Sequence, residues 1–249
     1  MNSDYANHSQ SEPHTLQLRQ VHTITDRFSM ANTYLLNEES IIIVDPGTEL
    51  NVRQIQSYLH KILQRPLSHI DLIVLTHLHP DHTAGVEALR KICAAPVAAS
   101  AIVRYLAQDD INERRSAPSF AHLAEHLLTG PLQHVDLFPP IYERQYKMVD
   151  IWLEDVKGLP GHPNWRVIAS PGHTAESLCL YNPFSQELLC GDSVITIQGG
   201  APLLRGSTNR VQLEETLRVL RSLQVHYLYP GHGRPILALN PLNNVDVEW

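Results

Sequence analysis

Histidine and aspartate are concentrated in one short segment of the chain. Residues 76–82 read THLHPDH and place three imidazoles and one carboxylate in six positions, at His77, His79, Asp81 and His82. Neutral imidazole and carboxylate are the ligands that zinc and its first-row neighbours take in proteins. A single histidine in a loop is more often solvated or hydrogen-bonded, but four such groups this close together predict a metal site.

Three later segments carry the same kinds of side chain beside glycine. They read PGHT at 171–174, GDS at 191–193 and PGHG at 230–233, and they add His173, Asp192 and His232. Glycine permits the tight turns that aim a side chain back over a sheet edge. Five histidines and two aspartates exceed the four ligands of one tetrahedral site, so the set favours two ions that share a bridging carboxylate and water. Zinc is preferred by affinity order, with iron and manganese as alternatives.

The elements that must position these side chains follow an α/β pattern. Strands are predicted at 15–24, 33–36 and 41–44, the last ended by the turn Asp45-Pro46-Gly47. Apolar residues at helical spacing then predict a helix over 49–64. A buried strand at 72–75, a polar loop at 76–82, a helix at 83–93 and a short strand at 96–98 complete the first series.

The second half of the chain repeats the alternation of strands and helices. Strands are predicted at 165–169, 177–181, 187–190 and 225–229, with a helix at 210–224 whose leucines recur on one stripe. Between the two halves, helix-like stretches interrupted by prolines predict a helical cap inserted at about 101–150. We therefore expect a flexible tail at 1–14 and a single domain over 15–249.

Composition narrows the function. The 249 residues carry 26 acidic and 19 basic side chains, a net charge of −7, which argues against nucleic acid as a partner. Apolar runs stop after about four residues, whereas a membrane span needs ~20. Three cysteines without a CxxC pair and a start that lacks a basic and apolar leader favour a reducing, cytoplasmic setting.

The order His77-x-His79-x-Asp81-His82, His173, Asp192, His232 resembles the metallo-β-lactamase superfamily, and the resemblance runs from Val44-Asp45-Pro46-Gly47 to Gly231-His232-Gly233. It implies a four-layer αβ/βα sandwich with a dinuclear site along one edge. The first ion would be bound by His77, His79 and His173, the second by Asp81, His82 and His232, and Asp192 would bridge them. Asp45 would support this set without binding an ion. A metal-bridging hydroxide would attack the substrate, with Asp81 as the catalytic residue that orients it.

The sequence departs from several branches of this superfamily, and these differences limit the range of expected substrates. β-Lactam hydrolysis is disfavoured because some lactamases use cysteine where Asp192 stands. Hydroxyacylglutathione hydrolases take part of their glutathione contact from a helical extension, but only 249 − 232 = 17 residues follow His232. Acyl-homoserine lactonases typically place tyrosine where this chain has Ile195. The prediction is therefore a hydrolase of a thioester, ester or lactone bond in a small molecule.

Two alternative functions stay open: a metal-containing ligand sensor without turnover, and a mononuclear iron enzyme that oxidises sulfur. A homodimer is also possible on the sequence. Apolar and aromatic residues of the expected cap either line a substrate pocket or only pack the cap against the rest of the fold. They are Tyr105, Phe120, Leu123, Leu127, Phe138, Tyr142 and Tyr146. For Arg205 and Asn209 a solvated loop is favoured over substrate contact. Cys190 is interpreted as a small buried hydrophobe.

Overall fold

The computed structural model describes residues 20–108, 146–196, 202–204, 206 and 208–247. The expected tail, the beginning of the strand expected at 15–24 and most of the expected cap lie outside these residues. Of the cap, the described parts are a short helix at 103–108 and the residues from 146 to the next strand.

The first sheet contains six strands in sequence order. They are β1 (Val21–Thr25), β2 (Asn32–Asn37), β3 (Ile41–Val44), β4 (Ile70–Val74), β5 (Val97–Ser100) and β6 (Ile151–Leu153). Pairing is antiparallel from β1 to β3 and parallel from β3 to β6. Helix α1 (Glu49–Tyr58), its π-helical extension Leu59–Leu63, the 3-10 turn Leu67–His69 and the short helices α2 (Pro80–Thr83) and α3 (Val86–Arg90) connect these strands.

Burial on both faces of β3 follows from its side-chain alternation. Ile41 and Ile43 pack toward the α1 and α3 side, whereas Ile42 and Val44 pack toward the second sheet. Because successive residues of a strand point to opposite faces, the four β-branched residues serve two cores at once.

The second sheet also has six strands, in the order β14-β13-β10-β9-β8-β7. Their bounds are Gly158–Leu159 for β7, His162–Ala169 for β8, Leu178–Asn182 for β9, Glu187–Gly191 for β10, Tyr227–Pro230 for β13 and Ile236–Leu237 for β14. Helix α7 (Arg210–Arg221) covers its outer face through Leu213, Leu217 and Leu220. A small third sheet combines β11 (Ile195–Thr196), β12 (Pro202–Leu204) and β15 (Asp246–Val247), and the 3-10 turn Pro241–Asn244 precedes β15.

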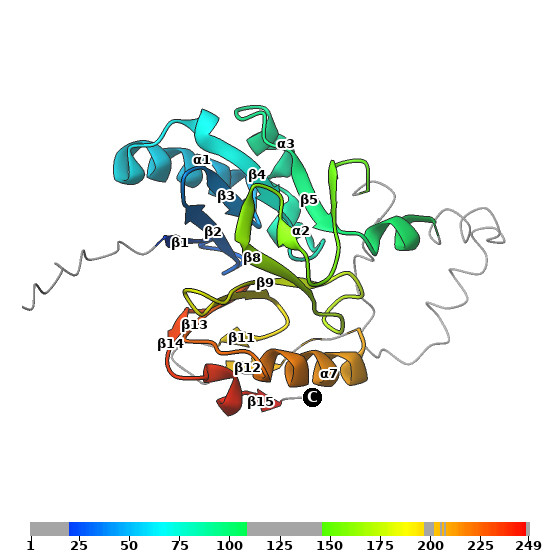
Figure 1. Cartoon of the computed structure of the whole chain (residues 1–249). Coiled ribbons are helices and arrows are strands. Elements are labelled where there is room, and N and C mark those ends of the chain that lie inside the picture. The colour runs from blue at the N-terminus through cyan, green and yellow to red at the C-terminus, as the bar shows by residue number, and fades with distance from the viewer. Residues whose placement is uncertain (1–19, 109–145, 197–201, 205, 207, 248–249) are drawn as a thin grey trace, which may run out of the picture.

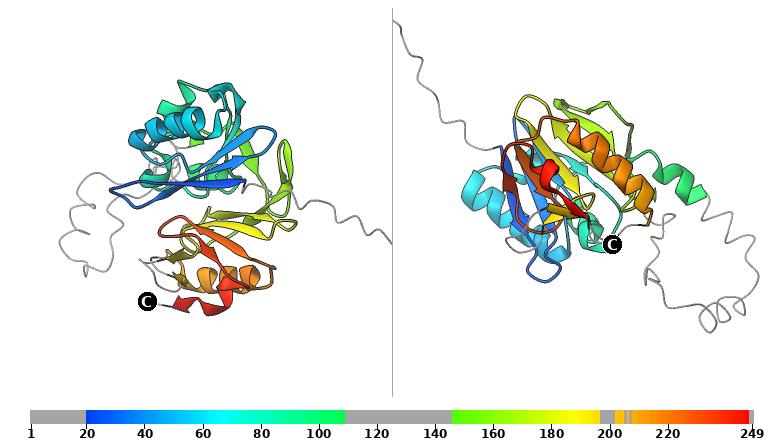
Figure 2. Two further views of the ribbon diagram at one scale, coloured as in Figure 1. Left: turned by 90° about the vertical axis from the view of Figure 1, so that its left-hand side faces the viewer. Right: turned by 90° about the horizontal axis from the view of Figure 1, so that it is seen from below.

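The two large sheets face each other across a shared core. Leu72 and Val74 of the first sheet and Trp165, Val167 and Leu180 of the second belong to one buried cluster. Figure 1 shows α1 and α3 outside the first sheet and α7 outside the second, and Figure 2 shows the same layers from two other sides. The order helix, sheet, sheet, helix confirms the expected αβ/βα sandwich.

Several elements differ from those expected. The helix expected at 83–93 is divided into α2 and α3 at Gly85, where a side chain would press against the Thr48 and Pro46 carbonyl oxygens. Helix α2 also extends into the segment expected as a loop, because Pro80 starts it in the first turn, a position that suits proline. The strand β8 begins three residues before the expected one, at His162. Among the described residues, no helix is long and apolar enough to cross a membrane.

Candidate metal centre

Five of the seven candidate ligands follow the carboxyl ends of strands. His77 and His79 follow β4, His173 follows β8, Asp192 follows β10 and His232 follows β13. Asp81 and His82 lie on α2, one turn further along the same segment. The four side chains of segment 76–82 follow a strand of the first sheet, and the other three follow strands of the second sheet.

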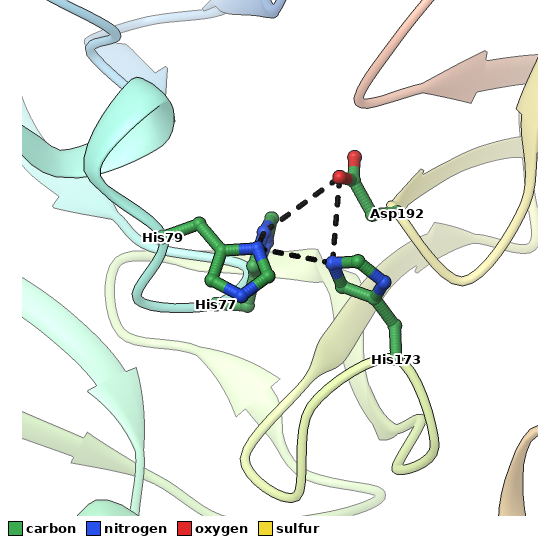
Figure 3. Close-up of side chains that lie close together, drawn as sticks. All are labelled: His77, His79, His173 and Asp192. Atoms are coloured by element: carbon green, nitrogen blue, oxygen red, sulfur yellow. Dashed lines mark hydrogen bonds and ion pairs between the residues drawn. The ribbon is translucent and has the colours of Figure 1, made fainter. Parts of the chain in front are cut away.

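Three imidazoles and one carboxylate form the first group, shown in Figure 3. Nδ1 of His79 lies 3.1 Å from Nε2 of His77 and 3.1 Å from Nε2 of His173. Oδ2 of Asp192 lies 3.5 Å from Nε2 of His173 and 3.8 Å from Nε2 of His77. These atoms therefore converge on one small volume.

The second group contains Asp81, His82 and His232. Nε2 of His232 lies 3.3 Å from Nε2 of His82 and 3.2 Å from Oδ2 of Asp81. Asp192 also reaches this group, with Oδ2 3.4 Å from His232 and Oδ1 3.7 Å from His82. One carboxyl group thus faces both groups.

Asp192 is held where it is by a close backbone approach. It is only 7% exposed, and its Oδ1 is buried without a hydrogen-bond partner. A Cβ built on Gly231 would overlap this oxygen. A buried carboxylate oxygen left unpaired is costly, and a cation between the two groups would satisfy it.

Asp45 and Thr76 orient two of the imidazoles. Thr76 donates its amide and hydroxyl hydrogens to the Asp45 carboxylate at 2.8 Å and 2.6 Å, and Nδ1 of His82 lies 3.1 Å from the same carboxylate. Because the Thr76 hydroxyl proton goes to Asp45, its oxygen accepts from Nδ1 of His77 at 3.1 Å. Both histidines therefore present Nε2 to the cluster.

His173 is oriented by a main-chain oxygen. Its Nδ1 donates to the Gly206 carbonyl oxygen at 2.6 Å, and the Thr208 amide donates back to the His173 carbonyl oxygen at 3.2 Å. This leaves Nε2 of His173 for the first group. The roles of Gly206 and Thr76 are not predictable from the sequence, because main-chain and hydroxyl oxygens carry no residue pattern that marks them.

The two groups differ in their proton affinity. Burial lowers the pKa of His77 well below its usual range and also lowers that of His79. Burial acts the same way on His82 and His232, but Asp192 and the other nearby carboxylates outweigh it and raise their pKa to about 9 and about 10. The carboxylates therefore stabilise positive charge at the second group, whether it is carried by protons or by a cation.

The donor set fits a pair of divalent ions. Ligand atoms ~2.0–2.1 Å from a tetrahedral ion stand about 3.4 Å apart, close to the separations of 3.1 to 3.8 Å in the two groups. Asp45 also falls within a group with His77 and His82. Its carboxylate oxygens already accept from Thr76 and His82, which favours a supporting role.

Other residues singled out in the sequence lie away from the cluster or serve the fold. Asn209 is exposed, as expected for a solvated position, and its side chain also accepts a hydrogen bond from the Gln212 amide at 3.0 Å, which caps α7. Cys190 is fully buried in the core under α7, as expected. Tyr146 stacks on Trp152, and Tyr105 is exposed. Arg205 and the other predicted lining residues lie outside the described part of the chain.

The sandwich and its His/Asp cluster together are typical of metal-dependent hydrolases. The family model described as the metallo-beta-lactamase superfamily matches residues 26–232. The chain belongs to the metallo-β-lactamase superfamily.

Individual relatives are distant. The probable metallo-hydrolase YqjP of Bacillus subtilis is 25% identical over 84% of this chain and 69% of its own length. A hydroxyacylglutathione hydrolase of Idiomarina loihiensis is 24% identical over 81% of this chain, but the match spans only 57% of that relative. The solved structure of TTHA1623 in a di-iron-bound form has a TM-score of 0.56 and 23% identity, covering 87% of this chain and 94% of that chain.

Proposed function

We propose that the protein is a dinuclear metal-dependent hydrolase that cleaves a thioester, ester or lactone bond in a small molecule. The observation that carries the proposal is the position of Asp192, whose carboxyl group faces three histidines on one side and His82, His232 and Asp81 on the other. A carboxylate shared in this way is what two adjacent ions require. The proposal assigns the first ion to His77, His79 and His173 and the second to Asp81, His82 and His232.

Two bound divalent ions would supply a hydroxide nucleophile at neutral pH and would polarise the attacked carbonyl group. The chain's own residues decide where this chemistry happens. Asp81 is 33% exposed and His232 24%, whereas His77 and His82 are buried. His79 and His173 are also partly exposed, so substrate can reach both groups from the side on which these four residues lie. The Asp81 carboxylate there can orient the nucleophile or accept its proton.

The class of reaction, the identity of the ion and the cellular setting each have one supporting observation. The relatives named as a probable metallo-hydrolase and a hydroxyacylglutathione hydrolase point to hydrolysis. Zinc is the ion favoured by the ligand types, and iron, which a solved relative holds as a pair, is the first alternative. Cys93, Cys179 and Cys190 are free and buried, which supports a reducing, cytoplasmic setting.

The test is turnover by the purified full chain on a panel of thioesters, esters and lactones. His79→Ala removes a ligand of the first group, so we expect kcat/KM to fall at least ~100-fold, with His60→Ala, an exposed histidine, as the matched control. Metal-replete protein that leaves the whole panel intact would contradict the hydrolase and favour a sensor. Oxygen consumption with a persulfide would instead indicate the mononuclear iron enzyme.

A further inference from the structure

A buried acidic side chain lies next to the segment that carries His77 and His79. Glu176 stands three residues after His173, is 1% exposed, and has no part in the ligand set. Its Oε1 accepts a hydrogen bond from the main-chain amide of Leu78 at 3.2 Å. The Glu176 carboxylate thus contacts the backbone between His77 and His79.

This contact joins two segments that are far apart in the sequence. A second bond lies beside it, because the Leu178 amide donates to the Thr76 carbonyl oxygen at 2.8 Å. One bond precedes His77 along the chain and the other follows it. The backbone that carries His77 is therefore fixed on both sides to the segment that carries His173.

The burial of Glu176 needs a physical reason. Removing a carboxyl group from water costs several kcal/mol unless its oxygens are satisfied. A shorter side chain at this position would leave the Leu78 amide without this acceptor. The Leu78 side chain is itself fully buried against the helix side of the first sheet, so the loop cannot move toward water to compensate.

We propose that Glu176 is a positioning residue that holds the 77–79 backbone against the His173 segment and thereby sets the geometry of the first group. His79 is the member that depends on it most, because its Nδ1 must lie between Nε2 of His77 and Nε2 of His173. The inference rests on the proposed function, since it assumes that the first group binds an ion.

The test compares two conservative variants of Glu176. Glu176→Gln keeps the length and an oxygen acceptor, whereas Glu176→Asp keeps the acid but is one methylene too short to reach Leu78. Removing a hydrogen bond to a ligating side chain typically lowers metal affinity 10- to 100-fold, and we take the same range for this bond to the backbone between two ligands. We expect that loss at the first group in Glu176→Asp and a change of less than ~3-fold in Glu176→Gln.

Affinities are measured by titrating the metal-free full chain with Co²⁺ against a chelator. The absorption bands of the two groups are assigned beforehand with His79→Ala and His232→Ala. Glu187→Asp is the matched control, because Glu187 is also a buried glutamate, hydrogen-bonded to Tyr229 at the other end of β10. Melting of the metal-free variants measures any general loss of stability.

The expected result is a selective weakening of the first group in Glu176→Asp, with Glu187→Asp binding Co²⁺ like the wild type. Unchanged affinities in Glu176→Asp would overturn the inference alone, and so would an equal loss in Glu176→Gln. A loss shared equally by both groups, in step with a lower melting temperature, would reduce Glu176 to a structural residue. Wild-type protein that takes up no Co²⁺ would instead contradict the proposed function itself.

Discussion

Asp192 is the most constrained side chain of the candidate centre. Its carboxyl group lies within 4 Å of His77, His82, His173 and His232. Burial alone would raise its pKa, yet the nearby histidines, His82 first among them, hold the pKa well below its usual range. The carboxyl group therefore stays ionised, as a shared ligand must.

The space for this carboxylate depends on Gly231. A methyl group there would overlap Asp192 Oδ1 and approach the Gly191 backbone, so Gly231→Ala must displace the carboxyl group from its place between the two groups. We expect the affinity for both ions to fall by at least ~10-fold, measured by chelator competition. Gly158→Ala is the control, because an added methyl group there meets only ordinary contacts of 3.6 Å or more. Equal affinities in the two variants would show that Asp192 tolerates the shift.

The sequence predicts which seven side chains come together, but not the residues that orient them. The seven candidates lie in four short segments that their residue types and spacing mark in the sequence. Glu176 and Thr76 act through hydrogen bonds to partners that only the fold brings near them. Nothing in the order of residues marks which buried acid will meet a particular amide.

The strands explain why the cluster forms at one edge of the sandwich. Asp45, His77 and His173 follow the carboxyl ends of β3, β4 and β8, whereas the residues at the starts of these strands lie at the opposite edge. There His162 of β8 joins the second sheet to the first. Its Nδ1 lies 2.9 Å from Glu38, and its Nε2 lies 3.2 Å from Asp71 and 3.3 Å from the Ser40 hydroxyl.

This second contact between the sheets is sensitive to pH. Burial lowers the pKa of His162, but the hydrogen bonds to Glu38 and Asp71 outweigh it and raise the pKa above the ordinary 6.5. The hydrogen bond from His162 lowers the pKa of Glu38 below the ordinary 4.5. The pair therefore stabilises the fold most between these two ordinary values. Its contribution is lost on the acid side as Glu38 is protonated and on the basic side as pH rises through the raised pKa of His162.

We expect His162→Gln to lower the free energy of unfolding by about 1 to 3 kcal/mol near pH 6, less than for a fully buried pair because Asp71 is 44% exposed. The difference from wild type should shrink as pH rises through the raised pKa, since the wild type then loses the same charge. Urea unfolding of both chains from about pH 5 to about pH 9 measures it. A difference that stays constant over this range would contradict this, because it would mean that folding leaves the pKa of His162 unchanged.

Long apolar elements were predictable and short ones were not. The strand 41–44 and the helix near 49–64 carry strong periodic patterns, and both exist close to the expected bounds. The two-residue strands β7, β11, β14 and β15 and the three-residue β6 and β12 are too short to show any period, because they form only by pairing with a neighbour.

Across the whole molecule, the candidate centre connects the two halves of the sandwich. The first half supplies His77, His79, Asp81 and His82, and the second supplies His173, Asp192 and His232. Ions bound between them would bind the folded chain and not the unfolded one. Metal binding and folding would therefore be coupled.

Removal of metal should accordingly destabilise the protein. An ion at 100 times its dissociation constant stabilises the folded state by about 2.7 kcal/mol, which a chelator would abolish. We expect the melting temperature to fall by several degrees on chelation and to recover with added Zn²⁺. The same treatment should change Asp192→Ala much less, because that variant has lost the shared ligand. An identical shift in the two chains would point to metal bound elsewhere.

The most direct test of the account is the metal content of gently purified full-length protein, measured by native mass spectrometry together with elemental analysis. Two groups that share Asp192 predict about two divalent ions per chain, both lost on Asp192→Ala. Less than one ion per chain, or an Asp192→Ala variant that still retains both, would contradict it.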